Sequence, residues 1–403
     1  MTTGREQVAA GRRADRPGLD YLEKVFSLMY PGSPVALRRA PGGRHSVAWA
    51  LVPTARNPSM LVPIGPRAAS VASLDELSKR GRGRLERIAR IVSRFGGLNL
   101  VPRLTVRRGG DDVQSVIART LSHDDVALSM VIGRTRALQK PVLRVLSEDG
   151  ATVGFAKIGI SEVTRALVRH ETEVLRGFEA DPPRHFSAPS VLGAVDWGEL
   201  TVLVQEPLRV GTRPDGEAVR RAAVEIAARG AVETRALADS RSWAELKARV
   251  TELPAAHPFT PGLARAVAHV DREWSRTPVL FGLWHGDFAE WNMTSDGAVL
   301  EVWDWEGCIG PVPAGFDLLH HRFQGDVVIG GRHPEAAFGD LLDTSSAVLS
   351  PWSPADPHLI VALYLIHLVT GLIETGDVET RISRLDDWLP SALQSIMDRR
   401  RSE

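Results

Sequence analysis

Short apolar runs separated by turn residues make up much of the chain before Pro207, and longer segments with apolar residues at helical spacing follow it. The predicted elements of the central part are strands at 126–132, 142–146 and 152–158, a helix at 162–178, and strands at 190–195 and 200–205. The Ser-Glu-Asp-Gly-Ala sequence between the second and third strands favours a tight hairpin. This order of elements is typical of an antiparallel sheet with one helix packed on it.

The first 110 residues have a pattern of their own. Two apolar runs between 47 and 64 flank Thr-Ala-Arg-Asn-Pro and predict a hairpin. Apolar residues at helical spacing predict a helix at 74–95, which a Gly-Gly pair would stop. A strand at 98–106 and a short helix at 112–121 follow. We interpret residues 1–110 as a small α/β extension to which the residues assign no chemistry.

Beyond Pro207 the pattern is mainly helical. Helices are predicted at 216–238, 242–252 and 261–275, and a segment from 283 to 305 interrupts the helical pattern. The expected domains are an N-terminal extension (1–110), a lobe built on the antiparallel sheet (111–209) and a helical lobe (210–403). The predicted fold class is therefore α+β.

Composition and charge limit the binding partners and the cellular compartment that can be expected for this chain. Residues 1–110 hold 20 basic and 7 acidic side chains without a dense basic run, and the remainder is acidic, which argues against nucleic acid as the main substrate. Cys308 is the one cysteine, so no intrachain disulfide can form. The first residues lack the apolar core of a signal peptide, and the apolar stretch at 359–373 is short for a membrane span. These features predict a cytoplasmic protein with no membrane partner.

The segment that interrupts the helical pattern carries the candidate chemistry. It reads Trp-His-Gly-Asp-Phe-Ala-Glu-Trp-Asn, then a Ser-Asp-Gly turn, then Ala-Val-Leu-Glu-Val-Trp-Asp-Trp-Glu. A hairpin through the turn would return Asp304, at the end of a strand, toward the loop that holds Asp287 and Asn292. Mg²⁺ prefers hard oxygen ligands, which Asn292 and Asp304 could supply, and Asp287 would then face an acceptor hydroxyl. Glu306 is expected to be a supporting or surface carboxylate.

This arrangement resembles the catalytic and metal-binding loops of protein kinases, and more closely those of the aminoglycoside phosphotransferase family. The family's His-Gly-Asp motif, its spacing from Asp to Asn and its later strand-end Asp match His285, Asp287, Asn292 and Asp304. The resemblance implies a two-lobed protein-kinase-like fold, a catalytic Asp287, and a supporting role for His285. It also implies that Asp317 holds the catalytic loop, although Asp317 equally fits an N-cap of the helix that it opens.

A phosphate-binding cation is predicted at Lys157. Five of the 49 basic residues are lysines, a bias typical of GC-rich bacterial genomes, and Lys157 lies in an apolar strand between Ala156 and Ile158. A lysine ammonium is a compact charge that suits phosphate, and its burial requires a partner. The resemblance assigns this nucleotide-site partner to Glu171 in the following helix and not to Glu173, which lies on another helical face.

Two further features follow from the resemblance. The end of the last strand of the sheet, with Glu206 and Leu208, corresponds to the hinge whose backbone binds the purine. The turn at 133–140 lacks the glycine-rich motif of protein kinases, Gly286 replaces their catalytic-loop Arg, and twelve residues separate the metal-site Asp from Asp317. The chain therefore leaves no room for a regulated activation loop, which favours a small-molecule kinase over a protein kinase.

The sequence predicts a phosphotransferase that uses ATP or GTP with Mg²⁺ to phosphorylate a hydroxyl of a small molecule, either antibiotic-like or sugar-like. The acceptor pocket is expected between the catalytic loop and the helices at 216–275 and 355–375, where Asp386, Asp387 or Glu374 could line the rim. The alternative is a nucleotide-binding module that serves regulation or assembly with little turnover. A binding module would not require a catalytic carboxylate, so the presence of one weighs against that alternative.

Overall fold

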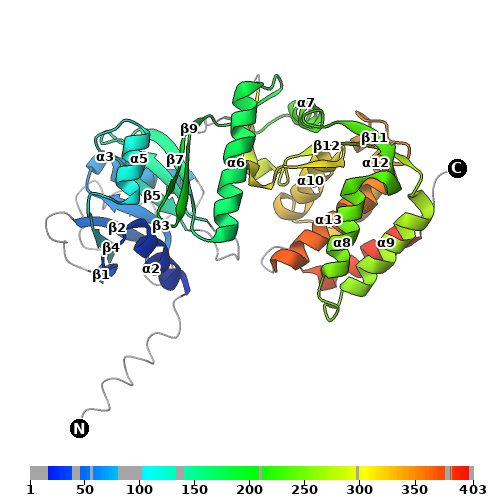
Figure 1. Cartoon of the computed structure of the whole chain (residues 1–403), viewed down its shortest axis with the longest axis horizontal. Coiled ribbons are helices and arrows are strands. Elements are labelled where there is room, and N and C mark those ends of the chain that lie inside the picture. The colour runs from blue at the N-terminus through cyan, green and yellow to red at the C-terminus, as the bar shows by residue number, and fades with distance from the viewer. Residues whose placement is uncertain are drawn as a thin grey trace, which may run out of the picture. The chain divides into compact units, whose positions relative to one another are not determined.

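The chain forms two compact units, which are described separately (Figure 1). The computed structural model describes residues 17–38, 46–54, 58–79, 102–132, 140–207, 211–295, 299–376, 382 and 384–398. The N-terminal unit comprises residues 1–172 and 190–207, and the C-terminal unit comprises residues 173–189 and 208–403. The division near 207 lies close to the boundary expected at 209, whereas the boundary expected at 110 falls inside the N-terminal unit.

One antiparallel sheet organises the N-terminal unit. Within its described residues, nine strands pair in the order β1-β4-β2-β3-β5-β6-β7-β10-β9. The strands are β1 Ala36–Arg38, β2 Ser46–Pro53, β3 Pro58–Ile64, β4 Arg103–Arg107, β5 Ala127–Val131, β6 Val142–Leu146, β7 Thr152–Gly159, β9 Val191–Trp197 and β10 Leu200–Gln205. Because β3 pairs with β5 through Leu61 and Met130, the expected N-terminal extension contributes strands to the same sheet as the following lobe.

The alternation of side chains along the strands places helices on both faces of this sheet. Trp49 and Leu51 of β2 belong to a core that includes α2 (Pro17–Met29) and α5 (Val113–Thr120). Ala50 and Val52, on the opposite face, pack with Leu74 of α3 (Arg67–Lys79). This two-residue period is the one that a half-buried strand requires. It follows that Lys157 of β7, which lies between the core residues Ala156 and Ile158, points away from α2 and α5.

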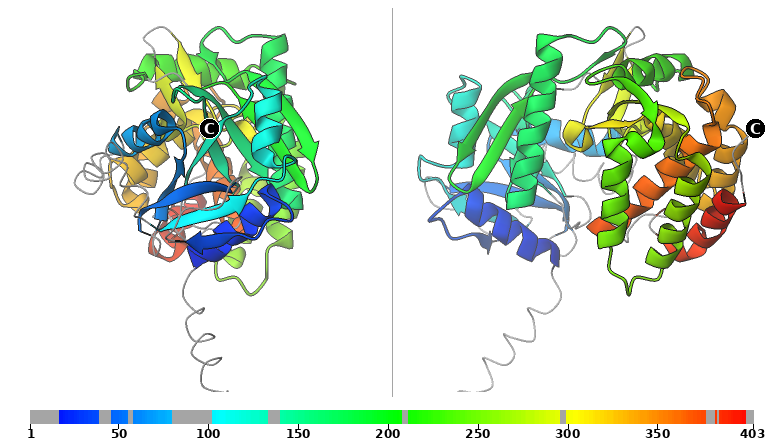
Figure 2. Two further views of the ribbon diagram at one scale, coloured as in Figure 1. Left: turned by 90° about the vertical axis from the view of Figure 1, so that its left-hand side faces the viewer. Right: turned by 45° about the vertical axis from the view of Figure 1, so that its right-hand side comes forward.

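Helices form the core of the C-terminal unit. They are α7 Gly216–Ala227, α8 Arg241–Glu252, α9 Thr260–Trp274, α10 Phe316–Gln324, α11 Pro334–Asp343, α12 Ser345–Val348, α13 Pro357–Thr375 and α14 Leu389–Met397, and α6 Glu162–Ala180 continues into this unit from the other. Helices α8, α9 and α13 lie side by side (Figures 1 and 2). Asp356 caps α13 through the N–H of His358 and also accepts a 2.7 Å hydrogen bond from the indole of Trp274, which ties α13 to α9.

Helix α13 is the element that most of this core surrounds. Among the described residues it is the helix that is long and apolar enough to cross a membrane by length and composition alone. Its residues from Leu359 to Ile366, together with Val369, are buried in the same core as α8, α9, α10 and α14. These residues of α13 therefore contribute to the core of the C-terminal unit.

Two small sheets complete the C-terminal unit and position the candidate site. One pairs β11 Glu233–Ala236, β12 Pro278–Trp284 and β15 Ile309–Pro313, and the other pairs β13 Met293–Ser295, β14 Leu300–Val302 and β8 Phe186–Ser187. Strand β12 leads directly into the segment with the candidate chemistry, and β15 leaves it.

Most predicted elements appear near their expected positions, and the exception is informative. The helix expected at 216–238 ends at Ala227, and residues 233–236 form β11 instead. Gly230 adopts a φ of +77°, which ends the helical path, and Glu233 then pairs with Phe281 of β12. A helical pattern in this segment is overridden by an available strand edge. The helix expected at 74–95 is described only to Lys79 as α3, and the rest of that prediction lies outside the described residues.

The N-cap of α5 provides a test of this packing. Asp112 is buried, and its Oδ1 accepts hydrogen bonds from the backbone N–H of Ser115 at 2.8 Å and from the Ser115 hydroxyl at 2.9 Å. We expect Asp112→Ala to lower the free energy of unfolding by about 1–2 kcal/mol, because the first turn of α5 loses its acceptor. Asp112→Asn, which keeps an acceptor oxygen, should lose less. Urea denaturation of both variants checks this, and equal losses would contradict it.

Candidate active site

The segment expected to carry the chemistry forms a loop followed by a short hairpin. Strand β13 pairs with β14 in the register Met293 to Val302, and the N–H of Trp303 donates to the carbonyl of Asn292 at 3.1 Å. The central turn residues 296–298 lie outside the described residues. This pairing brings the end of β14 back to the loop. Asp304 directly follows Trp303, whose N–H is hydrogen-bonded to Asn292.

Asp287 is held by donors from three directions. Its Oδ2 accepts from the amide Nδ2 of Asn292 at 2.8 Å and from the indole of Trp291 at 3.2 Å, and its Oδ1 lies 3.1 Å from Nε2 of His320. Burial alone would raise the pKa of Asp287, but the hydrogen bond and charge of His320 and the Trp291 bond outweigh it and lower the pKa. The side chain nevertheless remains 42% exposed. It is therefore an oriented, ionised carboxylate that a substrate can reach.

His285 joins the loop to the strand before Asp304. Burial lowers the pKa of His285 to about 4, so its imidazole is neutral. Its Nδ1 accepts the backbone N–H of Asp287 at 3.1 Å, and since that nitrogen is an acceptor, the proton is on Nε2, which donates to the carbonyl of Trp303 at 3.1 Å. One imidazole thus fixes both segments that carry the candidate site residues.

Asp317 fastens the same loop from α10. The carboxylate accepts the backbone N–H of His285, 3.2 Å from Oδ1, and it does not cap α10, whose N-cap is Gly315. Burial raises the pKa of Asp317 well above its ordinary value, and the His285 hydrogen bond opposes that rise only in part. Asp317 thus contacts the backbone of the loop that carries Asp287, and its role in a reaction stays a prediction.

His320 and Tyr364, which lie behind Asp287, were not identified from the sequence. Nδ1 of His320, on α10, lies 3.1 Å from the hydroxyl of Tyr364 on α13, and both side chains are buried. Burial and the charge of Asp287 raise the pKa of Tyr364 well above its ordinary value, so the phenol keeps its proton. The one signal in the sequence was a His-His pair three residues after Asp317, and nothing marked which of the two histidines faces inward.

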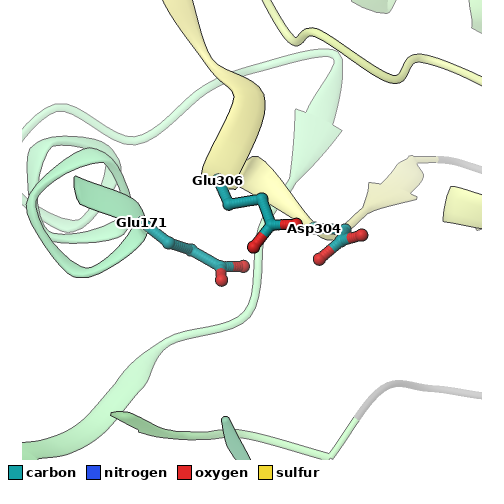
Figure 3. A group of neighbouring side chains, drawn as sticks. All are labelled: Glu171, Asp304 and Glu306. Atoms are coloured by element: carbon teal, nitrogen blue, oxygen red, sulfur yellow. The ribbon is translucent and has the colours of Figure 1, made fainter. Parts of the chain in front are cut away.

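The carboxylates of Asp304 and Glu306 lie close together in the segment just after β14 (Figure 3). A carboxylate oxygen of Asp304 lies within 4.8 Å of a carboxylate oxygen of Glu306. Asp304 adopts a left-handed conformation with a φ of +70°, which is uncommon for a residue other than glycine and occurs often at functional sites. These carboxylates and the amide of Asn292 are hard donors that suit Mg²⁺, so the residues of this unit fit the metal that the sequence predicts.

The N-terminal unit contains the predicted Lys157–Glu171 pair. Lys157 lies in β7 opposite Leu203 of β10, and Nζ forms an ion pair with Oε1 of Glu171 on α6. Both side chains are almost fully buried, whereas Glu173 is exposed. Since burial of two charges is costly unless they are paired, the pair defines one conformation for both side chains.

Glu206 and Leu208 are the remaining predicted site residues. Glu206 is exposed; its N–H donates to the carbonyl of Ser190, and its carboxylate accepts the Ser190 hydroxyl, both at 2.9 Å. Leu208 lies outside the described residues. The assignment of the hinge therefore stays a prediction.

Comparison with known proteins gives similar structures at low sequence identity. No protein-family model matches the chain, and no curated protein matches it. Its structure is similar to that of a thermostable mutant of aminoglycoside phosphotransferase APH(4)-Ia in its apo form, with 13% identity over 71% of this chain and 98% of the other and a TM-score of 0.47. A second similar structure is amicoumacin kinase hAmiN in complex with AMP-PNP, Ca²⁺ and Ami, with 13% identity over 67% of this chain and 88% of the other and a TM-score of 0.42.

A third similar structure is the GDP and kanamycin complex of APH(2")-IIia, with 11% identity over 70% of this chain and 96% of the other and a TM-score of 0.41. Because the identities and TM-scores are all low, the functional conclusion below rests on the residues of this chain.

The protonation of His285 can be tested directly. An exposed histidine has a pKa of about 6.5 and becomes charged as the pH falls below that value. We expect the imidazole of His285 to stay neutral there, with its proton on Nε2. Acidification below that value protonates His285 in the unfolded chain first, so its contribution to stability falls as the pH drops toward about 4. The raised pKa of Asp317 acts in the opposite sense, so total stability is not the measurement of choice. Nitrogen-15 NMR of the imidazole, assigned with His285→Gln, is decisive: a midpoint near the ordinary value or a proton on Nδ1 would contradict the prediction.

Proposed function

We propose that this protein is a phosphotransferase that moves the γ-phosphate of ATP or GTP onto a hydroxyl of a small molecule. The observation that carries the proposal is the state of Asp287, a carboxylate held by three donors yet still accessible. The hydrogen bond from the N–H of Trp303 to the carbonyl of Asn292 supports it further, because it joins the segment that carries Asp304 to the loop that carries Asp287. A binding module would require neither the orientation nor the exposure of this carboxylate.

Each residue has a role in this proposal. Asp287 orients the acceptor hydroxyl and accepts its proton as the new oxygen–phosphorus bond forms and the bond to the leaving nucleoside diphosphate breaks. Asn292 and Asp304 would hold Mg²⁺, which neutralises phosphate charge when bound. Lys157, kept in place by Glu171, would contact the nucleotide phosphates, and the segment that contains Glu206 and Leu208 would contact the base.

The supporting residues hold Asp287 in one conformation. His285 and Asp317 hold the backbone of the loop, and His320 holds Oδ1 of the carboxylate. Phosphoryl transfer depends mainly on positioning and on charge stabilisation, and little covalent chemistry is required of the protein. A buried network that orients one carboxylate is therefore the contribution that this reaction needs most.

The Lys157–Glu171 pair should be required for nucleotide binding. Lys157→Ala is expected to weaken the binding of Mg-ATP or Mg-GTP, because the phosphates lose a cation, and Glu171→Ala should do the same because Lys157 loses its buried partner. Isothermal titration calorimetry provides the measurement. Lys247→Ala removes a half-exposed lysine that pairs with Asp271 and is the matched control. Unchanged nucleotide affinity and turnover in both active-site variants would contradict the assignment of this site.

Substitution of the two aspartates should separate catalysis from binding. Asp287→Asn should keep nucleotide binding but lower the turnover rate by a factor on the order of 10²–10⁴, because the proton acceptor is lost. Asp304→Asn should instead weaken Mg²⁺-dependent nucleotide binding, because it removes a charged ligand. Asp340→Asn, at an exposed position of α11, controls for the loss of a surface charge.

Titration of Mg-nucleotide into the variants, together with turnover on aminoglycosides, peptide antibiotics, nucleosides and sugars, distinguishes the two effects. A wild-type protein that binds nucleotide but phosphorylates none of these compounds, and that Asp287→Asn leaves unaffected, would favour a nucleotide-binding module instead.

A further inference from the structure

The C-terminal unit contains a cavity of about 260 Å³ bounded by α8, β15 and α13. Phe281, Phe316 and Leu363 are almost fully buried and form apolar walls. Ser242 and Ile309 lie at more accessible positions, and 41% of the Ile309 surface is exposed. The volume is below the roughly 300–1,000 Å³ of sites for drug-sized ligands, which favours a ligand, or part of one, with one or two rings.

A hydrogen-bond donor in the cavity wall has no partner within the described part of the chain. His367 lines the cavity, and burial and the positive charge of Arg249 lower its pKa to about 3, so the imidazole is neutral. Its Nδ1 faces the Arg249 guanidinium at 3.4 Å, and because a guanidinium only donates, Nδ1 is the acceptor. The proton is therefore on Nε2, and that buried N–H has no hydrogen-bond partner among the described residues.

A second donor of the same kind lies beside it. The indole ring of Trp284 packs against the imidazole of His367 with ring centroids 5.0 Å apart, and its buried Nε1 likewise has no partner within the described ranges. Buried polar groups in folded proteins are nearly always hydrogen-bonded, so the N–H of His367, the one of these two donors whose residue lines the cavity, points to an oxygen supplied from outside the chain. Trp284 directly precedes His285, which places these donors next to the catalytic loop.

We propose that this cavity binds an uncharged aromatic small molecule that presents a carbonyl or hydroxyl oxygen to His367. The aromatic and aliphatic walls favour a flat apolar ring. The nearby charge of Arg249 is already neutralised, because the guanidinium makes hydrogen bonds of 2.9 and 2.7 Å to the carboxylate of Glu374. A charged ligand would lose its hydration without gaining an unpaired counter-ion. The site is defined by these contacts alone and does not depend on the proposed phosphotransfer.

The test uses two probes of the same shape that differ by one oxygen, a fluorinated indanone and a fluorinated indane, titrated into the full chain and followed by fluorine NMR. Wild-type protein should bind both and should bind the indanone more tightly. His367→Phe keeps a flat ring but removes the N–H, so it should weaken indanone binding about five- to tenfold, the value of one hydrogen bond, and leave indane binding unchanged.

Substitutions at the mouth of the cavity test its location. Ser242→Trp, and independently Glu245→Trp from an exposed position, should each weaken the binding of both probes more than about tenfold, because the new indole occupies the cavity. Ser391→Trp on the exposed side of α14 is the matched control and should bind both probes as wild type does. Near-UV circular dichroism confirms that each variant is folded.

Failure of the wild-type protein to bind either probe would overturn the proposal, as would folded variants at both 242 and 245 that bind like wild type. Equal weakening of both probes by His367→Phe would overturn the assigned hydrogen bond. Because binding is measured without nucleotide, these outcomes are independent of whether the protein transfers phosphate.

Discussion

The candidate active site depends on one buried, neutral imidazole. His285 bonds the backbone of Asp287 through one nitrogen and the backbone of Trp303 through the other. Both bonds require an imidazole with one acceptor and one donor, and burial supplies that state by lowering the pKa of His285. A charged imidazole would have two donors and would lose the bond to the backbone of Asp287. The relative position of Asp287 and Asp304 therefore follows from the desolvation of a residue that touches no substrate in the proposed reaction.

Close packing of the backbone makes this desolvation possible. Gly286, with a φ of +93°, lies so near the next segment that a Cβ atom would be 2.3 Å from the carbonyl oxygen of Gly307. A side chain at this position would separate the loop from the segment after Asp304 and admit water to His285. The Gly that stands in the His-Gly-Asp motif thus serves the contact between two backbones, and Asp317 closes the other side of the same loop.

The N-terminal unit obtains its charged pair from the alternation of a strand. Ala156 and Ile158 face the core that contains α2 and α5, so Lys157 between them faces the other side of the sheet, where α6 provides Glu171. The strands from before residue 110 extend the same sheet and share that core. Residues to which the sequence assigned no chemistry therefore belong to the same hydrophobic core as Ala156 and Ile158.

The sequence alone determined the features that depend on near neighbours. The hairpin that returns Asp304, the short helix expected at 112–121 and the strand position of Lys157 follow from turn residues and from periods of two and 3.6, which act over a few residues. The site residues His285, Asp287, Asn292 and Asp304 could be proposed because one loop and one hairpin carry them all. Only the tertiary structure decided the conversion of 233–236 into a strand, the His320–Tyr364 pair behind Asp287 and the cavity beside His367. These involve partners 33 to 118 residues apart, and no local pattern specifies which side chains long-range packing will bring together and deprive of water.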